Sequence, residues 1–217
     1  MTNSGLQKYE QNKSIDHSIP AIILAAGKSE RYGAPKVLQN FLGKPFLSRI
    51  ADALYDAGIA QIYLVLGYRA AQVQTQLPSI DGLQIVVNEN YKSGQISSLQ
   101  AGICALPPQC TGTLLCLIDQ PHLFASTYVK LLAVAHAAPA MIAVPVYDCH
   151  RGHPLYLPAW FGAEILRTPT TDSLRTVLAH YAEQIITVTV ADPGITVDID
   201  TPADLHRLEE LFPLNRK

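Results

Sequence analysis

Short apolar runs alternate with segments of helical periodicity over most of this chain, and this alternation constrains the fold more than any other feature. The runs that we expect to be strands are residues 21–26, 61–67, 83–88, 113–119, 140–147 and 185–190. The segments that we expect to be helical are residues 46–58, 70–77, 96–106, 126–137, 173–183 and 199–212. Strands that alternate with helices pair into a mostly parallel sheet covered on both faces. The pattern therefore predicts an α/β fold.

The rest of the chain bears on domain organisation and partners. Residues 1–19 are polar and are expected to form a flexible tail, and residues 20–217 to form a single domain. The segment from about 147 to 160 contains Pro and Gly and is expected to be a hairpin over the sheet edge. Charged residues make up 16% of the chain and the net charge is −2, which argues against a broad nucleic-acid surface. No apolar run is long enough for a membrane span, so we expect a cytoplasmic protein with no membrane partner.

The spacing of cysteine and histidine gives little support for a metal centre or a thiol nucleophile. None of the four cysteines forms a Cys-x-x-Cys pair. His150 and His153 are three residues apart, but no further zinc ligands are evident near them, so a loop that contacts substrate is the favoured interpretation. A Gly-x-Ser-x-Gly elbow is also absent, which leaves serine-hydrolase chemistry without support.

The loop after the first expected strand reads LAAGKSERYGAPK and contains a GKS triplet. A P-loop needs a glycine five residues before Gly27, but Ile22 occupies that position. The Gly-x-Gly-x-x-Gly fingerprint is missing as well, which argues against an NAD-dependent oxidoreductase. Neither established phosphate-binding motif therefore explains the loop.

The same loop still has the composition of a phosphate site. Ala25 and Ala26 come just past the carboxyl end of the strand, where open α/β sheets bind ligands, and small residues let a ligand approach the backbone amides. Arg31 and Lys36 add positive charge, and Lys28 adds more. The loop is suited to hold a nucleoside triphosphate. The alternative is a flexible glycine loop with solvated lysines.

Aspartates end two later segments. Asp119 follows an apolar run, where a carboxylate requires a cationic partner, and Mg²⁺ suits it because this ion takes few carboxylates and completes its shell with phosphates and water. The alternative is that Asp119 caps the turn before Pro121. In VDIDTP we expect only one of Asp198 and Asp200 to face the site. Asp200 is placed either to join Asp119 on one metal or to serve the next helix.

The sequence predicts the N-termini of two helices. In SGQISSL, Gly94, Ser97 and Ser98 open a helix whose N-terminus either binds an anion or is simply capped by a serine. In DTPAD, Thr201 is expected to cap a helix, with Pro at its first position and Asp204 completing a capping box.

Taken in order, LAAGKSERYGAPK, SGQISSL, LIDQP, RGHP and DIDTPADL resemble the MobA-like nucleotidyltransferases, and among them the molybdenum cofactor cytidylyltransferases. The resemblance covers nearly all of residues 20 to 212. It implies a three-layer Rossmann-like fold of the nucleotide-diphospho-sugar transferase type, with a mostly parallel sheet and helices on both faces. It also implies Mg²⁺-dependent transfer of CMP from CTP to the terminal phosphate of molybdopterin, with release of pyrophosphate. A molybdoenzyme or its chaperone is a possible further partner.

The resemblance also assigns roles to residues. The catalytic residues that it implies are Arg31, Lys36 and Asp119, with Asp119 and Asp200 as metal ligands. The implied nucleotide-binding residues are Leu24, Ala25, Ala26, Gly27, Lys36, Asn88, Ser98 and Asp119. Gly94 and His153 are assigned to the acceptor. The cytidylyltransferases read LAAG where the guanylyltransferases read LAGG, so Ala26 favours CTP over GTP.

The chain departs from the family pattern at two places, and two other functions remain open. Tyr32 stands where the family commonly has Met, and Gln95–Ile96 where a Gly-Met pair is usual. One alternative is a nucleotidyltransferase that activates a sugar phosphate or another small phosphorylated acceptor. The other is a protein that binds and delivers a nucleotide or cofactor without catalysis. Release of pyrophosphate from CTP and an acceptor distinguishes an enzyme from such a binding protein.

Overall fold

The computed structural model describes residues 19–211, so the expected tail lies outside the described residues except for Ile19, which is buried. An eight-stranded sheet runs through the molecule in the order β10-β7-β9-β6-β1-β4-β5, with β8 paired to β7. Its strands are β1 Ala21–Ala25, β4 Ile62–Leu66, β5 Leu83–Val87, β6 Gly112–Leu117, β7 Ile142–Tyr147, β8 His150–Arg151, β9 Leu155–Pro158 and β10 Ile185–Thr189. A separate antiparallel pair consists of β2 Asn40–Phe41 and β3 Lys44–Pro45.

The strands expected from the sequence pair in parallel, as predicted, and the segment after β7 behaves differently. β1 pairs in parallel with both β4 and β6, β4 with β5, and β7 with β10. The hairpin predicted over the sheet edge forms only in part, since β7 and β8 make a short antiparallel turn. The chain then enters the middle of the sheet as β9, antiparallel to both β6 and β7. Strand β9 is buried at every residue, so burial of its apolar side chains explains why it lies inside the sheet.

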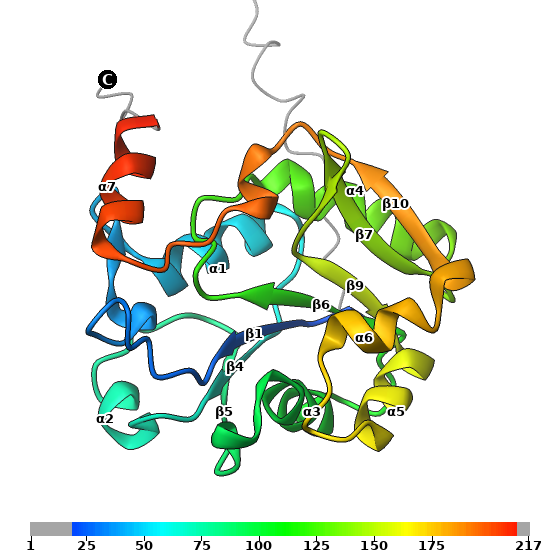
Figure 1. Ribbon diagram of the computed structural model, residues 1–217, viewed down its shortest axis with the longest axis horizontal. Coiled ribbons are helices and arrows are strands. Elements are labelled where there is room, and N and C mark those ends of the chain that lie inside the picture. The colour runs from blue at the N-terminus through cyan, green and yellow to red at the C-terminus, as the bar shows by residue number, and fades with distance from the viewer. Residues whose placement is uncertain (1–18, 212–217) are drawn as a thin grey trace, which may run out of the picture.

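Helices cover both faces of the sheet (Figure 1). They are α1 Phe46–Asp56, α2 Ala70–Gln74, α3 Gln95–Ala105, α4 Ala125–Ala137, α5 Ala159–Arg167, α6 Leu174–Ala179 and α7 Pro202–Leu211. Helices α1 and α4 lie on one face, and α3, α5 and α6 on the other. The three-layer α/β architecture is therefore confirmed. None of the helices described between residues 19 and 211 is long and apolar enough to cross a membrane.

The two layers of helices enclose two apolar cores, and β1 contributes to both. Ala21 and Ile23 point into the core beneath α1 and α4, whereas Ile22 and Leu24 point into the core beneath α3 and α5. A strand covered on both faces reads as a continuous apolar run, which is why this segment shows no alternation in the sequence. Helix α3 packs so closely on β1 that a Cβ at Gly102 would lie 2.8 Å from Ile22 Cγ2.

Helices α2 and α6 end three or more residues before their predicted ends. Helix α2 ends at Gln74 rather than at residue 77, since Pro78 disfavours helical backbone at the residue before it. Helix α6 ends at Ala179, and a 3₁₀ helix at Ala182–Gln184 follows it. The capping box before α7 forms as predicted. The hydroxyl of Thr201 accepts from the N–H of Asp204, and the Asp204 carboxylate accepts from the N–H of Thr201.

Candidate functional site

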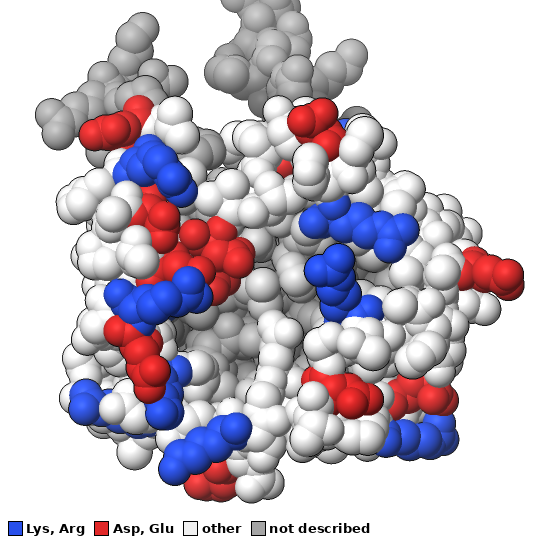
Figure 2. Space-filling model, viewed as in Figure 1, with Lys and Arg blue, Asp and Glu red and all other residues white. Residues whose placement is uncertain are grey.

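A cavity of about 680 Å³ opens at the edge of the sheet where the parallel strands β1, β4 and β6 end, and this volume suits a small organic ligand. Figure 2 shows a hollow in this face of the molecule, with acidic and basic side chains gathered together at one rim. The cavity is lined by the end of β1 and the loop after it, the end of β6, the start of α3 and the segment around residue 200. It therefore occupies the position at which open α/β sheets bind ligands.

The loop after β1 forms the floor of the cavity. Leu24, Ala25, Ala26 and Gly27 all line it, as the sequence predicted. The carbonyl of Ala26 accepts a hydrogen bond from the backbone N–H of Tyr68 at 3.1 Å, which fixes this part of the loop against the end of β4. A Cβ added at Gly27 would meet no other atom within 4 Å. The glycine therefore leaves open space beside the backbone, into which a ligand can approach.

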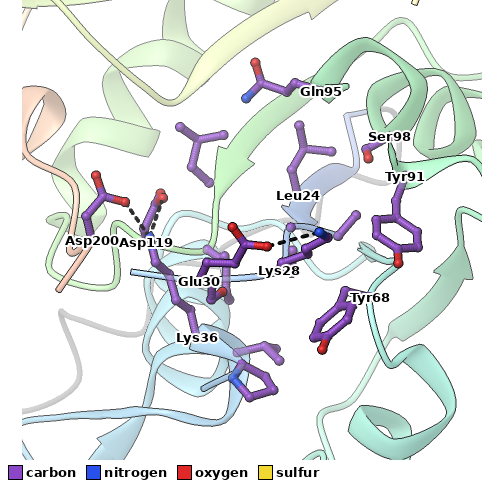
Figure 3. Close-up of a pocket in the computed structure, with 18 of the residues that line it drawn as sticks. Leu24, Lys28, Glu30, Lys36, Tyr68, Tyr91, Gln95, Ser98, Asp119 and Asp200 are labelled. Atoms are coloured by element: carbon purple, nitrogen blue, oxygen red, sulfur yellow. Dashed lines mark hydrogen bonds and ion pairs between the residues drawn. The ribbon is translucent and has the colours of Figure 1, made fainter. Parts of the chain in front are cut away.

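Basic and acidic side chains meet at one end of the cavity (Figure 3). The Nζ atom of Lys36 lies 2.8 Å from Asp200 Oδ1 and 3.1 Å from Asp119 Oδ2. The guanidinium of Arg31 lies 2.9 Å from the other oxygen of Asp200. The Lys36 side chain is only 8% exposed, so it is a buried cation, and a buried cation of this kind depends on its carboxylate partners. The structure thus brings together the catalytic and metal-binding residues that the sequence predicted.

Backbone hydrogen bonds explain why residues so distant in sequence meet here. The N–H of Ile118 donates to the carbonyl of Leu24 at 3.2 Å, which extends the pairing of β6 with β1 as far as the cavity. The N–H of Ile199 donates to the carbonyl of Asp119 at 2.9 Å. That bond holds the segment before α7 against the end of β6 and sets Asp200 beside Asp119. The capping box of α7 then fixes the direction in which the chain leaves the site.

The expectation that only one of Asp198 and Asp200 faces the site is wrong, because both line the cavity. Residues two apart on an extended segment share a face; Val197 has extended backbone angles, and residues 197–200 belong to no strand of the sheet. The amide of Gln120 donates to Asp198 Oδ1 at 2.9 Å. Desolvation and the nearby charge of Asp119 raise the pKa of the Asp198 carboxyl above its usual range. Asp198 is therefore a third acidic group at this end of the cavity.

The carboxylates at the acidic end fit a divalent cation whose other ligands come from phosphate oxygens and water. The Oδ1 atom of Asp119 is buried and accepts no hydrogen bond from any described residue, so it retains capacity for a cation. Between residues 19 and 211, however, no group of three His, Cys, Asp or Glu side chains is arranged to hold a metal. Two carboxylates with an otherwise open coordination shell match Mg²⁺ or Mn²⁺ bound partly through phosphate oxygens. Among residues 19–211, His150 and His153 belong to no such group of three side chains.

The opposite end of the cavity is aromatic, with Lys28 near its two tyrosines. The rings of Tyr68 and Tyr91 lie edge to face with their centroids 6.3 Å apart, and both residues line the cavity. Figure 3 shows Ser98 and Gln95, from the first turns of α3, on the same wall. Gly94 lines it as well. The cavity thus has a charged end suited to phosphates and an aromatic end suited to a flat ring.

Two predicted site residues do not reach the cavity. The amide nitrogen of Asn88 donates to the hydroxyls of Ser97 and Ser98, and its Oδ1 accepts from the N–H of Asn90, so this buried side chain holds the turn before α3 together. His153 follows the β7–β8 turn and lies outside the cavity lining, and burial lowers the pKa of its imidazole. The serine caps considered for α3 are also not formed, since no side chain caps this helix.

Several residues of the cavity lining were not singled out from the sequence, among them Tyr68, Tyr91 and Glu30. Tyr68 lies two residues past β4, and its position near the carboxyl end of a parallel strand was a usable signal. Tyr91 belongs to a 3₁₀ helix at Tyr91–Ser93, which periodicity does not reveal. Glu30 forms an exposed ion pair with Lys28 at 3.0 Å. The Lys28 ammonium is therefore bound to a carboxylate and not only to water. Loop contacts of this kind leave no pattern in a single sequence.

The chain is similar to known proteins over nearly its whole length. It is 26% identical over 199 residues to the molybdenum cofactor cytidylyltransferase of Escherichia coli K12, covering 90% of this chain and 97% of that protein. It is 34% identical over 122 residues to the bifunctional protein GlmU of Trichlorobacter lovleyi, but that match covers only 26% of GlmU.

Solved structures share the fold. The crystal structure of Rv0371c from Mycobacterium tuberculosis H37Rv matches with a TM-score of 0.72 and 27% identity, covering 89% of this chain and 97% of that one. The same protein has also been solved in complex with manganese. A nucleotidyl transferase from Methanothermobacter, at 21% identity, matches with a TM-score of 0.75 over 91% of this chain and 98% of its own, which shows the shared fold.

The model of the MobA-like NTP transferase domain matches residues 21–185, which is more than half of the chain. The matched region contains the loop after β1, Lys36 and Asp119, and it ends before Asp198 and Asp200. The cavity geometry and this match agree on a nucleotidyltransferase, and the chain belongs to the family of MobA-like NTP transferase domains.

Proposed function

We propose that this protein transfers CMP from CTP to the terminal phosphate of a molybdopterin-type acceptor and releases pyrophosphate. The observation that carries the proposal is the placement of Lys36, Asp119 and Asp200 at one end of a cavity whose floor is the LAAG backbone. The similarity to a molybdenum cofactor cytidylyltransferase over 90% of the chain supports the choice of substrates. The product would pass to a molybdoenzyme or its chaperone.

The reaction is an in-line displacement at phosphorus. An oxygen of the acceptor's terminal phosphate attacks the α-phosphorus of CTP, and the bond between the α-phosphorus and the bridging oxygen breaks. Pyrophosphate leaves with that electron pair. Such a transfer depends mainly on positioning and on neutralising charge, which is the work we assign to Lys36 and Arg31. The acceptor phosphate is already ionised at neutral pH, so the chain needs no general base.

We assign Mg²⁺ to Asp119 and Asp200. The buried Oδ1 atom of Asp119, which lacks a hydrogen-bond donor among the described residues, supports this assignment. When bound, the ion supplies Lewis-acid neutralisation of the phosphate oxygens. The two carboxylates orient the ion, and Asp198, held by Gln120, adds negative charge nearby.

We place the nucleoside at the aromatic end of the cavity. Tyr68 and Tyr91 offer ring surfaces on which a base can stack, and Ser98 offers a hydroxyl. Ala26 lines the cavity and is only 5% exposed. Its methyl group narrows the floor relative to glycine, which favours the smaller pyrimidine ring over guanine.

A screen for pyrophosphate release tests the function. Each nucleoside triphosphate is combined with molybdopterin or with common sugar phosphates in the presence of Mg²⁺. We expect release from CTP with molybdopterin, and little release from the Asp119→Asn variant. Release with a sugar phosphate but not with molybdopterin would support the other acceptor class. Tight binding of CTP without any release would support a delivery protein and contradict the enzyme.

A further inference from the structure

We propose that Lys36 acts as a built-in counter-ion that keeps a free divalent cation out of the acidic site until a triphosphate arrives. The inference rests on the proposed function, because it concerns the same nucleotide and metal. It adds an order to their binding: the cation enters with the triphosphate rather than before it.

The two carboxylates that we assign to the metal already have cationic partners without it. The ammonium of Lys36 contacts both carboxylates, at 3.1 Å from Asp119 and 2.8 Å from Asp200. The guanidinium of Arg31 contacts Asp200 at 2.9 Å. Two cations thus face the two carboxylates assigned to the metal, since lysine and arginine are both charged at neutral pH, while Asp198 stands beside them with its side chain bonded to Gln120. A further cation placed between these carboxylates meets a site that already has its counter-charge.

Burial makes the Lys36 contacts costly to break. The side chain of Lys36 is 8% exposed, whereas those of Lys28 and Arg31 are 46% and 72% exposed. These three are the basic residues that line the cavity. If a metal displaced the Lys36 ammonium from the two carboxylates, it would leave a buried charge without a partner, which is strongly unfavourable. Lys28 and Arg31, once displaced, return to water at little cost.

A triphosphate removes this obstacle. Lys36 lies on the cavity wall, and its long stem carries three donors that can turn from a carboxylate to a phosphate oxygen. The phosphates give the ammonium new anionic partners, and the carboxylates of Asp119 and Asp200 are then free for the cation. Binding of nucleotide and metal is therefore coupled, and the coupling is the same in both directions.

The test measures Mn²⁺ binding to the full-length chain by electron paramagnetic resonance, with and without CTP and without acceptor. The variants are Lys36→Met and Lys36→Gln, which remove the charge, and Lys44→Met as a control. Lys44 forms an exposed ion pair with Asp52 and does not line the cavity. Without CTP, we expect both Lys36 variants to bind Mn²⁺ about tenfold more tightly than the wild type, within the usual range of such couplings. Lys44→Met should bind as the wild type does.

Several results would overturn the inference. One is Mn²⁺ affinity in both Lys36 variants that equals or falls below that of the wild type. Another is a double variant, Lys36→Met with Asp119→Asn, that still binds Mn²⁺ more tightly than the wild type. The ion would then bind at a site that does not include Asp119. If neither variant folds, anomalous diffraction from wild-type crystals in Mn²⁺ alone decides: we expect no peak at Asp119, and a peak there overturns the inference. None of these measurements requires turnover. Failure of this inference can therefore be distinguished from failure of the proposed function in the pyrophosphate screen.

Discussion

The ammonium of Lys36 lies 2.8 Å from the carboxylate of Asp200, although 164 residues separate the two in the sequence. Lys36 begins a 3₁₀ helix at Lys36–Leu38, near the start of the described chain, and Asp200 precedes the last described helix. The contact closes the charged end of the cavity around Asp119. The chemistry that we propose depends on this meeting of the two ends of the fold.

Replacement of Asp119 by Asn should abolish most of the transfer while leaving the fold intact. The amide keeps the shape of the side chain but removes the charge that faces Lys36 and the metal. Because loss of an outer-shell partner alone costs about 10–100-fold, we expect kcat/KM to fall at least about a hundredfold. Pyrophosphate release measures this. Asp52→Asn, in an exposed pair with Lys44, is the matched control and should change little. Near-normal turnover of the Asp119 variant would refute its assignment.

Replacement of Ala26 by Gly should weaken the preference for CTP over GTP. Removal of one methyl group from the cavity floor makes room for a larger base, and a single methylene typically changes discrimination by about 10–200-fold. Competition between CTP and GTP measures the ratio of the two kcat/KM values. Ala25→Gly is the control, since Ala25 also lines the cavity but does not hold the family's distinguishing position. An unchanged ratio in Ala26→Gly would remove the argument for CTP.

Stability should fall between pH 7 and pH 5, and His122 should account for part of the loss. Burial lowers the pKa of the His122 imidazole; its bond to the carbonyl of Gly194 and the charges of Asp192 and Asp119 oppose this shift, while Arg49 adds to it. Because the folded chain then binds fewer protons than the unfolded chain, stability is lost as the pH falls through the unfolded value of about 6.5.

Chemical denaturation at several pH values measures this effect. His122→Gln should show a shallower dependence of the unfolding free energy on pH than the wild type. His153 also has a pKa lowered by burial, so part of the slope should remain in the variant. Identical slopes for the two proteins would show that His122 does not titrate as the structure indicates.

Replacement of Thr201 by Ala should destabilise the protein by about 1 kcal/mol, the usual cost of losing a helix cap. The Thr201 hydroxyl accepts from the N–H of Asp204 at 3.2 Å and donates to its carboxylate at 2.8 Å. Thermal unfolding measures the change. Thr201→Ser keeps the hydroxyl and should restore most of the stability. Equal losses in both variants would mean that the methyl group, not the cap, is responsible.

The sequence predicted the sheet, and most of the residues that it assigned to the site line the cavity, because both depend on local patterns. The apolar run of β1 and the glycine and lysine that follow it are adjacent in the chain, so their placement follows from strand direction alone. Lys36 and Asp119 both follow expected strands, and the structure brings them together as predicted.

Three features could not be predicted, because each depends on contacts between residues that are not neighbours in the sequence: the place of β9, the role of Asn88 and the position of Asp198. Strand β9 is short and apolar, and only the pairing with β6 and β7 reveals that it runs antiparallel in the middle of the sheet. Asn88 was assigned to the nucleotide, but its amide is used by Ser97 and Ser98. The position of Asp198 depends on the bond between Ile199 and Asp119, which joins residues far apart in sequence.

A crystal structure with CTP and Mn²⁺ tests the central claim most directly. The account predicts an anomalous peak between Asp119 and Asp200, with the triphosphate on that ion and the Lys36 ammonium turned towards the phosphates. The base should lie near Tyr68 and Tyr91, at the other end of the cavity. A bound triphosphate whose metal lies away from Asp119, with Lys36 still on both carboxylates, would contradict it.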